Sequence, residues 1–83
     1  MQKILVLVEI PSISKKFEVY LPVFLMIEEI IPLIIKAIKE LSNEQYVSSG
    51  YEFLCLKEKS ILLKGERKLE SYDVKNGDHL ILF

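Results

Sequence analysis

Two segments near the start of the chain alternate in polarity with the period of a β-strand. The first runs from Ile4 to Ile10, and the second, in which the alternation is cleaner, runs from Phe17 to Leu21. Successive side chains of a strand point to opposite faces, so each segment is expected to bury one set of alternate residues. Residues 11–14, Pro-Ser-Ile-Ser, are typical of a turn. The two segments therefore predict an N-terminal β-hairpin with a loop longer than two residues.

From Met26 onward the apolar spacing changes to that of an α-helix. One stripe at offsets of three, four and seven comprises Ile27, Ile30, Ile31, Ile34, Ile38 and Leu41. We expect the helix to end between Leu41 and Asn43 and a polar connector to follow it from Ser42 to Gly50. Pro32 lies inside the pattern, where it either kinks the helix after its first turn or marks a later helix start.

The second half of the chain predicts three further strands and a compact turn. Leu69, Tyr72 and Val74 are spaced as the anchors of a short loop or 3₁₀ turn. The strands are expected at Tyr51–Lys57, Ile61–Leu63 and His79–Phe83. The element order favours one α+β domain over residues 1–83, with a mixed sheet of four to five strands packed on one helix. In such a β-grasp fold the last strand can lie parallel to the first, in the middle of the sheet.

Composition narrows the possible functions. The chain is 51% hydrophobic with a formal net charge of −1, so a packed core is expected and no basic surface for nucleic acid or anionic lipid. Cys55 is the single cysteine, which excludes an internal disulfide and favours a reducing, cytoplasmic setting. The start of the chain lacks the pattern of a signal peptide. Charged residues within Leu21–Leu41 argue against a membrane span.

No pattern in the sequence carries catalytic chemistry. Cys55 and His79 are the only residues of their types, and a nucleophilic pair is conceivable, but each lies in a predicted strand without a third orienting group. The scattered carboxylates lack metal-ligand spacing, and no glycine pattern cradles phosphate. We therefore expect no catalytic residue, no metal and no cofactor.

Several stretches resemble ubiquitin-like proteins. They are the opening strand from Met1-Gln2, the helix, and residues 69–80, Leu-Glu-Ser-Tyr-Asp-Val-Lys-Asn-Gly-Asp-His-Leu, which contain the Leu-x-x-Tyr-x-Val turn before the last strand. More narrowly, residues 17–25 and the Gly77-Asp78-x-Leu80 entry resemble the EsaB/YukD family of Gram-positive bacteria. The resemblance implies a ubiquitin-like β-grasp and an accessory role in type VII (WXG100) secretion. Pro32 departs from the ordinary helix former expected there.

Ubiquitin-like modifiers and sulfur carriers need a flexible tail that ends in Gly-Gly. The sequence stops at Phe83, at the end of a predicted strand, so we expect a non-conjugating protein. Two alternatives stay open. The chain could be a modifier or sulfur carrier whose tail is missing from this sequence, or the soluble ubiquitin-like domain of a larger secretion membrane protein.

The strands are apolar on both faces, which is unusual for a sheet covered on one side. We assign to the helix side Ile4, Val6, Val8, Ile10, Phe17, Val19, Leu21, Leu54, Leu56, Leu80 and Leu82. The alternate residues then point away from the helix and predict one contiguous protein-binding patch of Leu5, Leu7, Phe53, Cys55, Ile81 and Phe83. The expected partner is a protein of the secretion machinery or a second copy of the chain, with rim charges such as Lys3, Lys57 and Lys64 orienting it. The rival interpretation is that the Ser42–Gly50 loop covers part of this patch.

Overall fold

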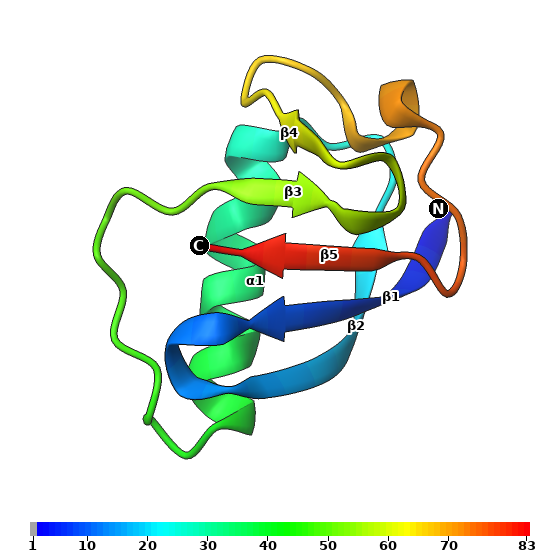
Figure 1. Cartoon of the computed structure of the whole chain (residues 1–83). Helices are drawn as coiled ribbons and strands as arrows, with labels where there is room; N and C mark the ends of the chain where they lie inside the picture. The colour runs from blue at the N-terminus through cyan, green and yellow to red at the C-terminus, as the bar shows by residue number, and fades with distance from the viewer. Residues whose placement is uncertain (1) are drawn as a thin grey trace.

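A five-stranded mixed sheet packed against one helix forms the fold in the computed structural model, which describes residues 2–83 (Figure 1). Strands β1 (Lys3–Ile10) and β2 (Lys15–Pro22) form the predicted antiparallel hairpin. Between them Pro11–Ile13 forms a 3₁₀ turn that Ser14 closes in the left-handed region at φ 53°. Met1, which opens the stretch that resembles ubiquitin-like proteins, lies outside the described residues.

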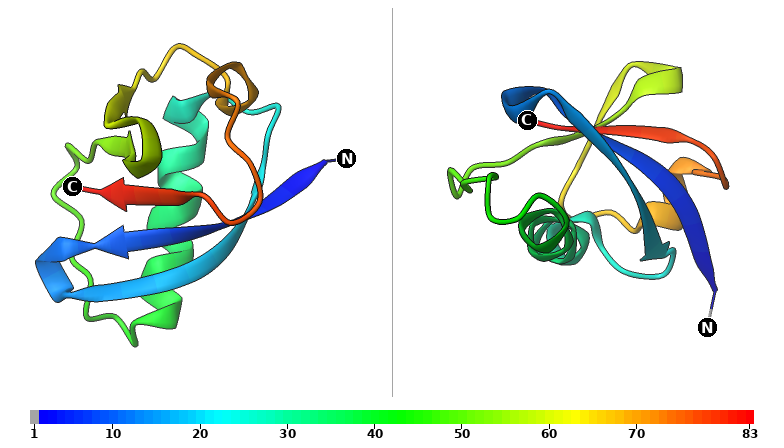
Figure 2. Two further views of the ribbon diagram at one scale, coloured as in Figure 1. Left: turned by 45° about the vertical axis from the view of Figure 1, so that its right-hand side comes forward. Right: turned by 90° about the horizontal axis from the view of Figure 1, so that it is seen from below.

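The remaining strands give the sheet the order β2-β1-β5-β3-β4. They are β3 (Leu54–Leu56), β4 (Ile61–Leu63) and β5 (His79–Leu82). β5 lies in the middle, parallel to β1 and antiparallel to β3. The predicted α+β β-grasp, with the last strand parallel to the first in the middle of the sheet, is therefore confirmed. Figure 2 shows the twist of the sheet and the helix against one of its faces.

Two strand boundaries differ from the prediction. The third strand was predicted over Tyr51–Lys57 but is confined to β3, because Lys57–Lys59 forms a 3₁₀ turn into β4 and no strand lies beside Tyr51. β5 ends at Leu82 rather than Phe83. Phe83 and Phe53 nevertheless exchange backbone hydrogen bonds of 2.9 and 3.0 Å, so the pairing of β3 with β5 continues to these two residues.

Helix α1 (Ile27–Leu41) crosses one face of the sheet and begins before Pro32, which excludes the later start. Its first turn is held from outside the helix. The N–H groups of Ile27 and Glu28 donate to the carbonyls of Arg67 and Gly65, at 2.8 and 3.1 Å. Because these bonds satisfy donors that have no partner inside a helix, they stabilise the turn that precedes the proline.

The buried stripe of α1 follows i, i+4 spacing through Ile30, Ile34 and Ile38 and continues into Ser42, which is 2% exposed. Ser42 thereby takes the place predicted for Leu41, which is 54% exposed, so that part of the prediction was wrong. The 3₁₀ turn Leu69–Tyr72 matches the predicted compact turn, and Leu69, Tyr72 and Val74 are all buried as its anchors.

Every strand residue assigned to the helix side lies in or against the core. Eight are fully buried, and the three others are partly buried and packed against them, namely Ile4, Phe17 and Val19. The Ser42–Gly50 connector was predicted to be polar, but one of its residues belongs to the core: Tyr46 is only 6% exposed.

Candidate functional site on the outer sheet face

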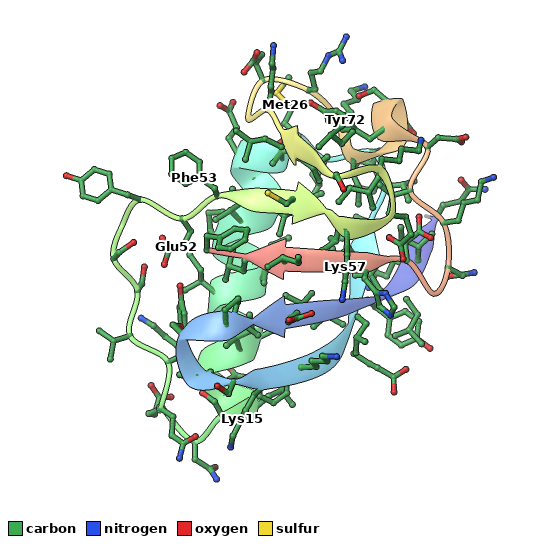
Figure 3. All side chains as sticks on the ribbon, in the orientation of Figure 1. Lys15, Met26, Glu52, Phe53, Lys57 and Tyr72 are labelled. Carbon is green, nitrogen blue, oxygen red and sulfur yellow. The ribbon has the colours of Figure 1, made fainter. Side chains whose placement is uncertain are left out.

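The six predicted patch residues all lie on the sheet face that points away from α1. This face is turned toward the viewer in Figure 3, with the helix behind the sheet. Phe53 and Phe83 are 57% and 58% exposed, and the other four are partly buried. The Ser42–Gly50 loop does not cover them, since Ser48 and Gly50 line a groove beside α1 instead.

The strand register gathers apolar side chains at one end of this face. Cys55 of β3 is paired with Ile81 of β5 on one side and with Leu62 of β4 on the other. Phe53 and Phe83 form the next pair along the same two strands. We call this group the β3–β5 patch, and it consists of Phe53, Cys55, Leu62, Ile81 and Phe83.

Leu62 is a member that the sequence prediction missed. Its side chain is 51% exposed, whereas Leu63 beside it is buried. The segment Ile61–Leu63 has three apolar residues in succession, so alternation alone does not say which one faces outward. Only the pairing with Cys55 settles this.

Leu5 and Leu7 lie on the same face, on strand β1, and the β3–β5 patch as defined here does not include them. The parallel register places His79 beside Leu7 and Glu9 beside Ile81. Glu9 also forms an ion pair with Lys57 across β5, with 3.5 Å between Oε1 and Nζ. The polar side chains of Glu9, Lys57 and His79 therefore border the β3–β5 patch on the side of β1.

The structure does not assemble the conceivable Cys55–His79 pair. His79 Nδ1 lies 3.2 Å from Glu58 Oε2, and the His79 backbone N–H also donates to that carboxylate. The Cys55 thiol is partly buried beside Ile81 and Leu62. Across residues 2–83, no three His, Cys, Asp or Glu side chains come together as metal ligands.

A groove of about 560 Å³ lies on the other side of the molecule, between α1 and the loop that leads into β3. Ile31, Pro32 and Ile35 provide its apolar part. The loop is held in place by Glu52, whose carboxylate accepts hydrogen bonds from the hydroxyls of Tyr46, at 2.7 Å, and Ser48. This groove was not predictable from the sequence, because a polar connector forms one of its walls.

The acid–base properties of the loop follow from these bonds. Burial acts to raise the pKa of Glu52, but hydrogen bonds from Ser48, Tyr46 and backbone N–H groups outweigh it, and the pKa lies below its ordinary value. Burial, together with the neighbouring Glu52 carboxylate, raises the pKa of the Tyr46 hydroxyl. The hydrogen bonds of the loop therefore favour the charged form of the Glu52 carboxylate.

This predicts an acid-sensitive loop. A carboxyl group whose pKa is lowered in the folded state adds stability above its unfolded pKa and loses that contribution as the pH falls through the folded pKa. We expect Glu52→Gln to be less stable than the native chain at pH 7, and this difference to be smaller at pH 3. Urea unfolding at both pH values measures this, with Glu44→Gln on the same loop as control. A pH-independent difference would contradict it.

The family model described as "WXG100 protein secretion system (Wss), protein YukD" matches residues 5–82. The chain belongs to the YukD family. This confirms the resemblance found in the sequence and associates the chain with WXG100 secretion as a ubiquitin-like accessory protein. A search of curated protein sequences finds no significant match.

Solved structures show the same fold at low identity. The EccD5 ubiquitin-like domain from Mycobacterium xenopi superposes with a TM-score of 0.79 at 22% identity, covering 100% of this chain and 94% of that one. The ubiquitin-like domain of the Mycobacterium tuberculosis type VII secretion protein EccD1 gives 0.76 at 18% identity, covering 99% and 98%. A chain of an ESX-5 inner membrane complex gives 0.71 at 20% identity, covering 100% of this YukD-family chain but 21% of that one. Within residues 2–83, this member of the family has no helix long and apolar enough to cross a membrane.

Proposed function

We propose that this YukD-family protein is a non-catalytic accessory component of a type VII (WXG100) secretion system and acts by binding another protein of that system in the cytoplasm. The observation that carries the proposal is the β3–β5 patch. It brings five apolar side chains together on three neighbouring strands, and three of them are more than half exposed. A grouped apolar surface on a small domain is typical of a protein interface.

The patch combines exposed aromatic residues with charged residues at its border, as protein interfaces commonly do. Phe53 and Phe83 supply large aromatic contact areas, which contribute strongly to binding when a partner excludes water from them. The Glu9–Lys57 ion pair borders the patch on the β1 side. Border charges of this kind orient a partner more than they add affinity, a role we also assign to Lys64.

The comparisons support a partner within the secretion machinery. The matched family is described by its secretion system, and one structural relative belongs to a membrane complex of a related system. The net charge of −1 and the lone cysteine suit a cytoplasmic protein partner rather than nucleic acid.

Site-specific photocrosslinking tests the proposal. A photoreactive phenylalanine analogue at position 53 in the source cell should give one dominant adduct with a protein of the secretion system, identified by mass spectrometry. The control places the analogue at Leu33, an exposed apolar residue of α1 that is 44% exposed. Equal yields of the same adduct from both positions would contradict binding through the β3–β5 patch.

A second candidate has one observation in its favour. The chain matches a 21% part of the ESX-5 complex chain, so it could act as the ubiquitin-like domain of a larger protein in such a complex. The complete reading frame of the gene decides between the two. Apolar segments of about 20 residues downstream of Phe83 would favour the larger protein.

A further inference from the structure

Strand β2 forms one edge of the sheet, and its outer side is the longest edge in the fold. It pairs with β1 over eight residues, and within residues 2–83 no other strand lies beside it (Figure 1). The opposite edge, β4, has only three residues. An exposed edge presents backbone N–H and C=O groups that can pair with an added strand.

The hydrogen-bond pattern identifies which backbone groups of β2 point outward. Val23 N–H donates to the Gln2 carbonyl at 3.3 Å. These two residues lie one position beyond the Lys3–Pro22 pair and continue the register of the hairpin. In an antiparallel ladder, hydrogen-bonded pairs alternate with pairs that are not hydrogen-bonded to each other. The next hydrogen-bonded pair is therefore Ile4 with Leu21, and every second pair after it follows the same pattern. The intervening β2 residues, Lys16, Glu18 and Tyr20, therefore direct their N–H and C=O groups away from β1.

An independent observation on β1 gives the same answer. The N–H of Leu5 donates to the Asn76 side chain at 2.8 Å, and the N–H of Leu7 donates to the Asp78 carbonyl at 3.0 Å. Both acceptors lie in the segment that leads into β5. Because these groups bond toward β5, the β2 residues opposite them, Tyr20 and Glu18, face the open edge.

The side chains along this edge carry a recognisable pattern. Lys16 and Glu18 are exposed on the outer face, whereas Phe17 and Val19 lie on the helix side and are only partly buried at the border of the core. Pro22 has no N–H and closes the edge at its far end. Edge charges and proline limit unselective pairing. Lys16 and Glu18 can still form favourable pairs with opposite charges on an added strand.

We propose that the outer edge of β2 binds an extended segment of another protein, which adds to the sheet as an antiparallel strand. That segment places an acidic residue opposite Lys16, a basic residue opposite Glu18 and apolar residues against Phe17 and Val19. The opposite charges set its register, because like charges directly across a ladder are unfavourable. This surface is separate from the β3–β5 patch, since β1 and β5 lie between β2 and β3.

Two designed peptides test the proposal by nuclear magnetic resonance with the isotope-labelled full chain. The first, Ser-Val-Thr-Val-Lys-Ile-Glu-Ser, matches the charges of the edge when aligned antiparallel. The second, Ser-Val-Thr-Val-Glu-Ile-Lys-Ser, exchanges them. We expect the first to bind about tenfold more tightly than the second. Binding should shift the amide signals of Lys16, Glu18 and Tyr20 and slow their hydrogen exchange.

The double variant Lys16→Glu with Glu18→Lys should reverse the preference of the two peptides, whereas Lys68→Glu, at an exposed site away from β2, should leave it unchanged. The spectrum of each variant reports whether it is folded. The proposal is overturned if neither peptide shifts these amides at millimolar concentration, or if the preference does not reverse. Phe53→Asp should bind the first peptide normally, so this result is independent of the proposed function.

Discussion

Replacing Leu80 with alanine is expected to lower the free energy of unfolding by about 2–5 kcal/mol. Leu80 is 0% exposed and lies in the central strand β5, between Val8 of β1 and Leu56 of β3. Removal of its branched side chain leaves a cavity. The neighbouring strands on both sides are held in the sheet and cannot move in to fill it. A domain of this size has a total stability of about 4–12 kcal/mol, so the variant is expected to be marginally folded.

Urea unfolding followed by circular dichroism measures this change, and Leu62→Ala is the matched control. It removes the same atoms from a side chain that is 51% exposed on the opposite face. Its cost is expected to stay below about 1 kcal/mol. Similar losses for the two variants would contradict the assignment of the faces.

Aspartate at positions 53 and 81 is expected to abolish partner binding. Phe53→Asp should weaken the affinity for the crosslinked partner at least tenfold, and the double variant with Ile81→Asp about a hundredfold or more, because central aromatic and aliphatic anchors dominate interface energies. A buried carboxylate without a partner adds a further cost to the complex.

Isothermal titration calorimetry with the purified partner measures the affinities, and urea unfolding confirms that each variant is folded. Leu33→Asp introduces the same charge on the exposed side of α1 and should bind normally. Unchanged affinity in the folded double variant would rule out the β3–β5 patch. Sedimentation velocity of the native chain and of Phe53→Asp shows whether the partner is a second copy.

The fold was predictable from the sequence because its signals are local. Alternation in β1 and β2 assigned each side chain to a face, and the spacing of Ile27 to Ile38 assigned the buried stripe of α1. The end of the helix was less predictable. Leu41 fits the apolar pattern, but Ser42 occupies the buried position. The burial of Tyr46 was not predicted, because most of its neighbours in the sequence are polar and show no apolar pattern.

The site was only partly predictable, because it depends on register between strands that are distant in sequence. Alternation placed the six predicted residues on the outer face. It could not show that Glu9 would lie beside Ile81, or that Leu62 would join Cys55. A shift of two residues in the pairing of β1 with β5 would leave every side chain on its own face but change all its neighbours. Pairing geometry, not composition, therefore defines the β3–β5 patch.

Methyl-resolved nuclear magnetic resonance of the partner complex tests binding through the β3–β5 patch most directly. The methyl signals of Ile81 and Leu62 should shift or broaden when the partner is added, while those of Leu33 and Leu41 on α1 stay unchanged. Shifts confined to the α1 leucines, with Ile81 and Leu62 unaffected, would contradict the account.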